Sequence, residues 1–87
     1  MKIAYKASVD SDLKRLDKQF ALRILGQLEK KLTTGNHSRM VLRGEFAGLY
    51  RLRFGEYRVI FIPTEDGFLI LRIGHRKEVY RKGPLTR

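Results

Sequence analysis

Apolar and polar residues alternate at the start of the chain, and the spacing then changes to that of a helix. In residues 2–8, Ile3 and Tyr5 alternate with lysines, which is typical of a half-buried strand. From residue 9 an apolar stripe with helical spacing predicts a helix, and Ser8 or Asp10 is expected to cap its N-terminus. The stripe consists of Val9, Leu13, Leu16 and Phe20.

A second helical stripe follows directly. Its apolar positions are Ala21, Ile24, Leu25, Leu28 and Leu32. The boundary between the two helices stays open, because residues 17–23 contain neither glycine nor proline. Gly26 is interpreted as a point of close packing, since glycine in a helix interior costs about 1 kcal/mol relative to alanine. Residues 33–36 are expected to end the helix with Gly35 as a left-handed cap, before a connection over residues 37–42.

From residue 49 the pattern changes to a period of two, which predicts a β-hairpin. Gly55 and Glu56 fit its two-residue turn, where glycine supplies the positive φ. The residues expected on the core side are Tyr50, Leu52, Phe54, Tyr57, Val59 and Phe61. Those expected on the opposite side are Arg51, Arg53, Arg58, Ile60 and Ile62.

The remaining signals complete a sheet. Pro63 is expected to end the second hairpin strand, and residues 64–67 to form a turn. Residues 68–76 are nearly continuously apolar, which predicts a strand that is central or covered on both faces, ended by Gly74. This order predicts an α+β fold, with two N-terminal helices packed on a twisted, mainly antiparallel sheet of about four strands. We expect a single domain over residues 1–87, of which about 78–87 form a basic C-terminal tail.

The net charge of the chain indicates which kinds of partner it binds. The chain of 87 residues carries 19 lysines and arginines against 9 acidic residues, a net charge of +10. Such an excess favours RNA, DNA, an anionic membrane or an acidic protein as partner. Residues 1–40 contain six lysines and three arginines, whereas residues 41–87 contain eight arginines and two lysines. Because arginine binds phosphate in a planar, bidentate way, the second half is the predicted polyanion-binding part.

Several classes of protein are disfavoured. The absence of cysteine excludes disulfides and thiolate chemistry, and it fits a cytoplasmic protein. We expect no signal peptide, because charges come before any apolar run, and no segment that spans a membrane. The sequence shows no metal-ligand spacing and no phosphate-binding glycine loop, so we expect no metal and no cofactor.

The arginines of the hairpin define a candidate phosphate-binding surface. The next strand and its exit extend the set, whose members are Arg51, Arg53, Arg58, Arg72, Arg76, Lys77 and Arg81. One arginine on a strand is a common solvated residue, but repulsion within such a cluster favours an anionic ligand. Metal-free RNA cleavage needs a deprotonated 2′-OH, a stabilised phosphate charge and a protonated 5′-oxygen, and arginines suit the second role.

Other side chains offer proton transfer. Tyr80 would donate a proton or stack on a base, or else pack the tail onto the sheet. His75 is a candidate because an unperturbed imidazole titrates near neutral pH, although a histidine between glycine and arginine is more often a surface residue. Glu78 would act as a base or, more simply, pair with an arginine. His37 lies in a connection and is a weaker candidate.

Three segments together resemble a known family. They are "LRG" at 42–44, "LYRLRFGEYRVIF" at 49–61 and "IGHRKEVY" at 73–80. In this order they are similar to the RelE/ParE superfamily of toxins from toxin–antitoxin modules, over nearly the whole chain. The resemblance implies the RelE-like fold and, for the RelE branch, a type II toxin that cleaves mRNA in the ribosomal A site and so inhibits translation.

The resemblance also implies roles for individual residues. Arg58, Arg76 and Tyr80 match the catalytic residues, with Arg58 on the scissile phosphate. The residues implied to bind RNA or rRNA are Arg51, Arg53, Lys77 and Arg81. The RelE pattern has lysines on the second strand, one of which is thought to activate the 2′-OH, and arginine is a poor base. Either His75 or Tyr80 then takes the proton, or catalysis depends on electrostatics. The tail before Tyr80 is also shorter than in that pattern.

Two alternatives stay open. The ParE branch has the same fold and poisons DNA gyrase without cleaving RNA, and a non-catalytic basic module would bind rRNA or an acidic protein. The resemblance further implies a cognate antitoxin that wraps the toxin with an amphipathic helix and acidic residues. The ribosome with its mRNA is the implied target, in the cytoplasm.

Overall fold

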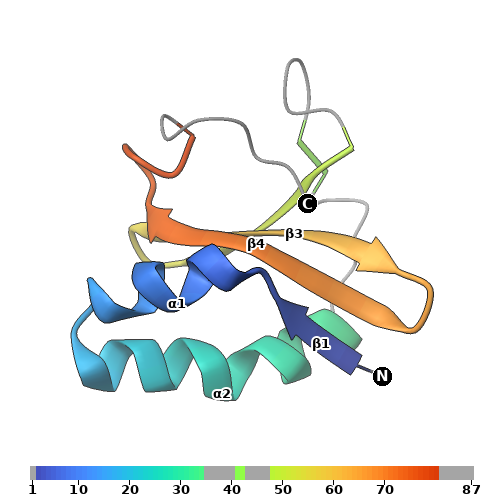
Figure 1. The fold of residues 1–87 in the computed structure, drawn as a ribbon, viewed down its shortest axis with the longest axis horizontal. Coiled ribbons are helices and arrows are strands. Elements are labelled where there is room, and N and C mark those ends of the chain that lie inside the picture. Colours follow the sequence, from blue (N-terminus) through green and yellow to red (C-terminus); the bar gives the residue numbers. More distant parts are fainter. Residues whose placement is uncertain (1, 35–40, 43–47, 81–87) are drawn as a thin grey trace.

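The protein folds as two helices packed against one face of a four-stranded sheet (Figure 1). The structure, a computed structural model, describes residues 2–34, 41–42 and 48–80. The elements in chain order are β1 (Lys2–Tyr5), α1 (Ala7–Lys14), α2 (Lys18–Thr34), β2 (Tyr50–Phe54), β3 (Tyr57–Thr64) and β4 (Gly67–His75). The sheet order is β1-β4-β3-β2, with β1 parallel to β4 and the other pairs antiparallel. The predicted α+β fold is therefore confirmed.

The helices cover one face of the sheet and create the main core there. Its buried residues are Val9, Ile24, Leu28, Leu32, Leu52, Phe54, Val59, Phe61, Phe68, Ile70 and Ile73. Phe61 lies fully buried at the centre, with its ring 5.5 Å from that of Tyr50 and 5.6 Å from that of Phe68. The predicted core side of the hairpin is thus the helix-facing side. None of the helices in the described part of the chain is long and apolar enough to cross a bilayer.

The opposite surface, called the far face below, carries a second and smaller apolar cluster. Its buried members are Ile60, Ile62, Leu71 and Val79. A β-bulge separates Ile60, which pairs with Arg72, from Phe61, which pairs with Ile70. The extra residue on β4 is Leu71, so Leu71 and Arg72 both serve the far face. The prediction that β4 is central and covered on both sides is confirmed.

The helix starts differ from the sequence prediction. Lys6, not Ser8 or Asp10, is the N-cap of α1, and both predicted caps lie inside its first turn. The sheet decides this start, because the Lys6 N–H donates to the Ile70 oxygen at 2.9 Å and holds the chain extended up to that point. The open boundary between the helices is set by Asp17, whose carboxylate accepts the Phe20 N–H at 3.2 Å and caps α2.

The turns and strand ends of the sheet follow the sequence prediction with two exceptions, at Pro63 and Gly74. Gly55 has φ +60°, and Phe54 pairs with Tyr57 across the predicted two-residue turn. Pro63 does not end β3, which continues to Thr64. Pairing with β2 stops at Phe61, so the missing N–H of Pro63 leaves no gap in that ladder. Strand β4 also continues one residue past Gly74.

Gly26 lies on an exposed part of α2, where a Cβ atom would meet nothing within 4 Å. The interpretation of Gly26 as a point of close packing is therefore wrong. The other predictions for this region, a cap at Gly35 and the role of His37, lie outside the described residues.

Substitution Gly26→Ala is expected to stabilise the protein by about 1 kcal/mol, because alanine loses less backbone entropy in a helix and meets no steric obstacle here. Urea denaturation monitored by circular dichroism measures the change. Gly55→Ala is the matched control and should lose stability, since its φ of +60° disfavours a side chain. An equal loss in both variants would contradict the expectation.

Candidate functional site

The sheet register brings the predicted basic residues of the hairpin together on the far face. Arg53 pairs directly with Arg58, and Arg58 pairs with Gly74 on β4. In the next row, Ile60 lies between Arg51 on β2 and Arg72 on β4. Like charges placed opposite each other on neighbouring strands are destabilising. An anion bound at this surface would relieve that repulsion.

Arg58 is held by the hairpin turn beside it. Its Nη1 donates to the carbonyl oxygens of Gly55 and Tyr57, each at 2.9 Å. Among the described residues, its Nε and Nη2 groups have no hydrogen-bond partner. The guanidinium is thus fixed through one nitrogen, and the donors that remain have the fork geometry that a phosphate requires.

Arg76 lies at the same end of the sheet and contacts the hairpin turn. Its Nε is 2.6 Å from the Glu56 carboxylate, and its backbone N–H donates to the Glu56 oxygen at 2.8 Å. Both side chains of this ion pair are more than half exposed. Such pairs contribute about 0–1 kcal/mol, so a phosphate group can replace the carboxylate at little cost. Among the described residues, the acid that pairs with Arg76 is therefore Glu56 and not Glu78.

The chain after β4 folds back over the far face. The Glu78 and Val79 N–H groups both donate to the His75 oxygen at 2.9 Å, and Val79 is 1% exposed. Tyr80 is half-buried and packs against the far-face apolar cluster. It therefore lies on the same face as Arg58. Lys77 is exposed, and the predicted contact residue Arg81 lies outside the described residues.

His75 lies on the other side of the sheet. It pairs with Tyr57, whose ring is 5.5 Å from the imidazole and 5.0 Å from the ring of Phe20 on α2. The Lys77 N–H donates to His75 Nδ1 at 3.1 Å. The structure does not bring the imidazole onto the face that carries Arg58. Proton transfer by His75 stays a prediction. The imidazole would have to reach the RNA past the end of β4, from the opposite face of the sheet.

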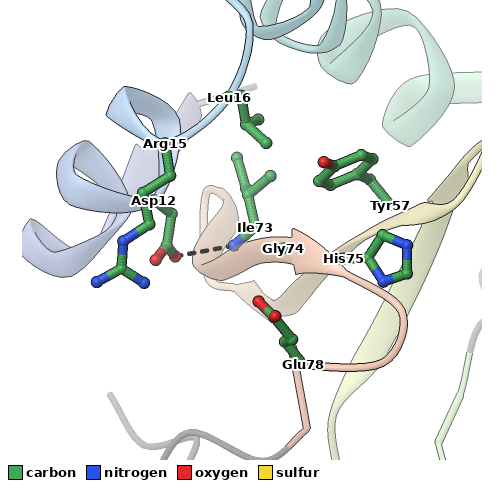
Figure 2. A pocket seen from close by; sticks show the side chains of 8 residues that line it. All are labelled: Asp12, Arg15, Leu16, Tyr57, Ile73, Gly74, His75 and Glu78. Atoms are coloured by element: carbon green, nitrogen blue, oxygen red, sulfur yellow. Dashed lines mark hydrogen bonds between the residues drawn. The ribbon is translucent and has the colours of Figure 1, made fainter.

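His75 instead lines a cavity of about 100 Å³ between α1, the end of β4 and the turn that follows (Figure 2). Asp12 contributes from α1, Arg15 from the C-cap of that helix, Tyr57 from β3 and Glu78 from the turn. Figure 2 shows the Asp12 carboxylate accepting the Ile73 N–H, at 3.0 Å. Strand β1 pairs with β4 only as far as Ile70, so Asp12 continues the hydrogen bonding of that edge. No local pattern predicts this contact, because the two residues lie 61 positions apart in the chain.

Substitution Asp12→Ala is expected to destabilise the fold by about 1.5–3 kcal/mol, because it removes a hydrogen bond to a charged group and leaves the half-buried Ile73 N–H without its partner. Thermal and urea unfolding measure the loss. Asp10→Ala on the same helix is the control, since its exposed pair with Lys14 should contribute about 0.5 kcal/mol at most. Similar losses in the two variants would rule out a special role for Asp12.

A second cavity, of about 430 Å³, lies between β1, α1 and α2 and is mainly apolar. Tyr5, Val9, Leu13 and Leu25 contribute to its wall. Burial raises the pKa of the Tyr5 phenol, and the nearby Glu29 carboxylate raises it further. The phenol therefore stays protonated at neutral pH. This cavity lies on the helix side of the sheet, away from the arginines.

Comparison with known proteins gives the family. The sequence model described as "ParE toxin of type II toxin-antitoxin system, parDE" matches residues 3–80, which is nearly the whole chain. The chain belongs to the RelE/ParE toxin superfamily. It is a toxin of the type II toxin–antitoxin kind, and the resemblance seen in its sequence is confirmed. No curated protein sequence matches it significantly.

Solved structures of RelE toxins share the fold of this RelE/ParE toxin. The toxin–antitoxin complex RelBE2 of Mycobacterium tuberculosis contains a chain with a TM-score of 0.72 and 23% identity, covering 88% of this chain and 92% of that one. The RelB–RelE complex of Methanococcus jannaschii gives a TM-score of 0.67 at 22% identity, with 93% and 99% covered. A doubly substituted E. coli RelE in the free state gives 0.69 at 15% identity, with 90% and 87% covered. At these identities the likeness establishes the fold alone.

Proposed function

We propose that this toxin is a ribosome-dependent endoribonuclease that cleaves mRNA in the ribosomal A site and thereby inhibits translation. The observation that carries the proposal is the meeting of Arg51, Arg53, Arg58 and Tyr80 on one face of the sheet. Arg76 lies at the edge of that face, in an ion pair that a phosphate can replace. Cations for a phosphodiester and the Tyr80 side chain thus lie on the same face of the sheet, with the Tyr80 phenol oxygen buried against it.

The proposed reaction is an internal transfer at phosphorus. The 2′-hydroxyl releases its proton to solvent as its oxygen attacks the phosphorus, the bond to the 5′-oxygen breaks, and the products are a 2′,3′-cyclic phosphate and a 5′-hydroxyl end. Arg58 and Arg76 stabilise the negative charge that builds up on the phosphate oxygens. Tyr80 orients the nucleotide or gives its phenolic proton to the leaving 5′-oxygen. Arg51, Arg53 and the tail residues Lys77 and Arg81 bind the RNA backbone and rRNA.

Electrostatic stabilisation carries most of the rate enhancement in this proposal. An arginine guanidinium does not lose its proton in proteins, so the arginines on this face are poor bases. The imidazole of His75 lies on the other face of the sheet. The phosphate contacts of Arg58 and Arg76 are therefore the proposed main contributors, and they act without a metal or a cofactor.

The proposal includes a partner and a location. Structures similar in fold are complexes of RelE with RelB and of YoeB with YefM. We propose that this chain is a single toxin domain and that it acts in the cytoplasm. We also propose that a cognate antitoxin binds it. Acidic residues of the antitoxin would complement the net charge of +10.

A second candidate function is inhibition of DNA gyrase without RNA cleavage, as in the ParE branch. The match of the ParE toxin family over residues 3–80 favours it, as does the position of His75 away from the arginines. A basic, non-catalytic face would then serve to bind the target.

In vitro translation with the purified toxin separates these functions, with mRNA ends mapped by primer extension and ribosome-free RNA as the control. Cuts at A-site codons that require ribosomes are the expected result. Intact mRNA and normal translation would overturn the ribonuclease proposal. A gyrase supercoiling assay on the same preparation then tests the second candidate.

A further inference from the structure

Arg72 differs from the other arginines of the far face in what it contacts. Its Nη1 donates to the backbone oxygen of Val79 at 3.1 Å, in a partly buried setting. Val79 directly precedes Tyr80 in the chain. Arg53, on the same face, is exposed and has no hydrogen-bond or ion-pair partner among the described residues.

The geometry of the sheet directs the Arg72 side chain toward the turn that follows β4. The bulge at Leu71 places Leu71 and Arg72 on the far face, where Arg72 pairs with the buried Ile60. Its aliphatic stem can then cover the apolar cluster while the guanidinium reaches the turn. Arg72 was predicted to belong to the phosphate-binding set because it lies on the strand next to the hairpin, but its guanidinium has a protein partner.

The turn over residues 76–80 is held to the sheet by the burial of Val79 in the far-face apolar cluster and by polar contacts. Its amides bond to the His75 oxygen, and Val79 lies over Gly74, where an added Cβ would be 3.6 Å from the Val79 side chain. The ion pair of Arg76 with Glu56 is exposed and therefore weak. The contact from Arg72 is charge-assisted and partly buried, so as a polar link between this turn and the sheet it is stronger than the exposed Arg76–Glu56 pair.

We propose that Arg72 is a positioning residue, which holds the turn carrying Arg76 and Tyr80 against the sheet and does not itself bind RNA. The expected effect of Arg72 on the cleavage rate rests on the proposed ribonuclease function. The expected effect of Arg72 on the position of the turn does not. The turn places Tyr80 on the face that carries Arg58 and places Arg76 against Glu56 in the hairpin turn, and small displacements of catalytic groups lower rates strongly.

The test compares Arg72→Met with Arg53→Met. Each substitution removes one positive charge from the far face and keeps an unbranched side chain, but Arg72→Met alone removes a contact to the turn. Circular dichroism and thermal unfolding first establish that both variants are folded. Hydrogen exchange of the Val79 amide, followed by NMR on the purified toxin, then reports the turn directly, without reference to activity.

In Arg72→Met the Val79 amide should exchange about tenfold faster or more, and in Arg53→Met it should be unchanged. Single-turnover cleavage of ribosome-bound mRNA should show a maximal rate reduced about tenfold to a hundredfold in Arg72→Met, with an unchanged half-saturating toxin concentration. Arg53→Met should instead raise the half-saturating concentration. Adding Arg72→Met to the double variant Arg76→Ala/Tyr80→Ala should cost little more than that double variant alone, because Arg72 acts through these two residues.

Unchanged Val79 exchange in a folded Arg72→Met variant would overturn the proposal. So would a raised half-saturating concentration with an unchanged maximal rate, since that result would make Arg72 an RNA contact. If the wild-type toxin cleaves no mRNA but Arg72→Met still speeds the exchange, the ribonuclease function fails while the anchoring of the turn by Arg72 stands.

Discussion

Substitution Arg58→Ala is expected to slow mRNA cleavage on the ribosome about a hundredfold to a thousandfold, the cost of removing one donor that stabilises transition-state charge. The hydrogen bonds from Nη1 to the Gly55 and Tyr57 oxygens fix the guanidinium in the wild type. A preorganised cation of this kind needs no rearrangement as the phosphate charge develops. Single-turnover cleavage at saturating toxin measures the loss.

Two variants control for charge and shape. Arg23→Ala removes one positive charge from an exposed position of α2 and should leave the rate within about threefold. Arg58→Lys keeps the charge but loses the planar fork, and it should recover only part of the rate. A folded Arg58→Ala variant that cleaves as fast as the Arg23→Ala control would show that Arg58 does not stabilise the reacting phosphate.

Substitution Phe61→Ala is expected to destabilise the protein by about 3–5 kcal/mol, because it empties a fully buried site at the centre of the sheet. The total stability expected for 87 residues is about 4–13 kcal/mol. The variant should therefore approach complete unfolding at 37 °C. Urea denaturation of the purified protein measures the change, and lost activity in this variant would report unfolding and not catalysis.

Leu22→Ala is the matched control, because Leu22 is 60% exposed and its loss should cost about 0.5 kcal/mol or less. Leu13→Ala should fall between the two. A cost of about 2–5 kcal/mol would apply to a fully buried leucine, but Leu13 is only partly buried on α1. A small loss for Phe61→Ala, comparable to that of Leu22→Ala, would contradict the central position of this ring in the core.

Local periodicity predicted most of the fold, because the spacing of apolar residues, every second residue in a strand or every 3.6 residues in a helix, can be read from short segments of the sequence. The hairpin around Gly55 and the central strand β4 are as predicted. The start of α1 and the effect of Pro63 are not, because pairing with a distant strand decided both. At Gly26 a packing role was inferred from residue type alone, and the exposed position in α2 shows otherwise.

For the site, alternation along the hairpin sufficed to place Arg51, Arg53 and Arg58 on one face. Near the end of β4 alternation was not enough. The bulge at Leu71 redirects Arg72, and the cross-strand pair with Tyr57 places His75 on the helix side. Arg76 pairs with Glu56, and not with Glu78, because the hairpin turn lies beside the end of β4.

The sequence by itself determined the α+β class, the basic and apolar sides of the hairpin and the membership of a toxin superfamily, because each of these depends on short-range pattern or on motif order. Only the tertiary structure decided which cations are available to a ligand. Arg58 keeps donors free among the described residues, Arg76 shares an exposed carboxylate, and Arg72 is bonded to the turn before Tyr80. These differences arise from where folding places the hairpin turn, the bulge in β4 and the turn after β4, which the alternation of residue types does not record.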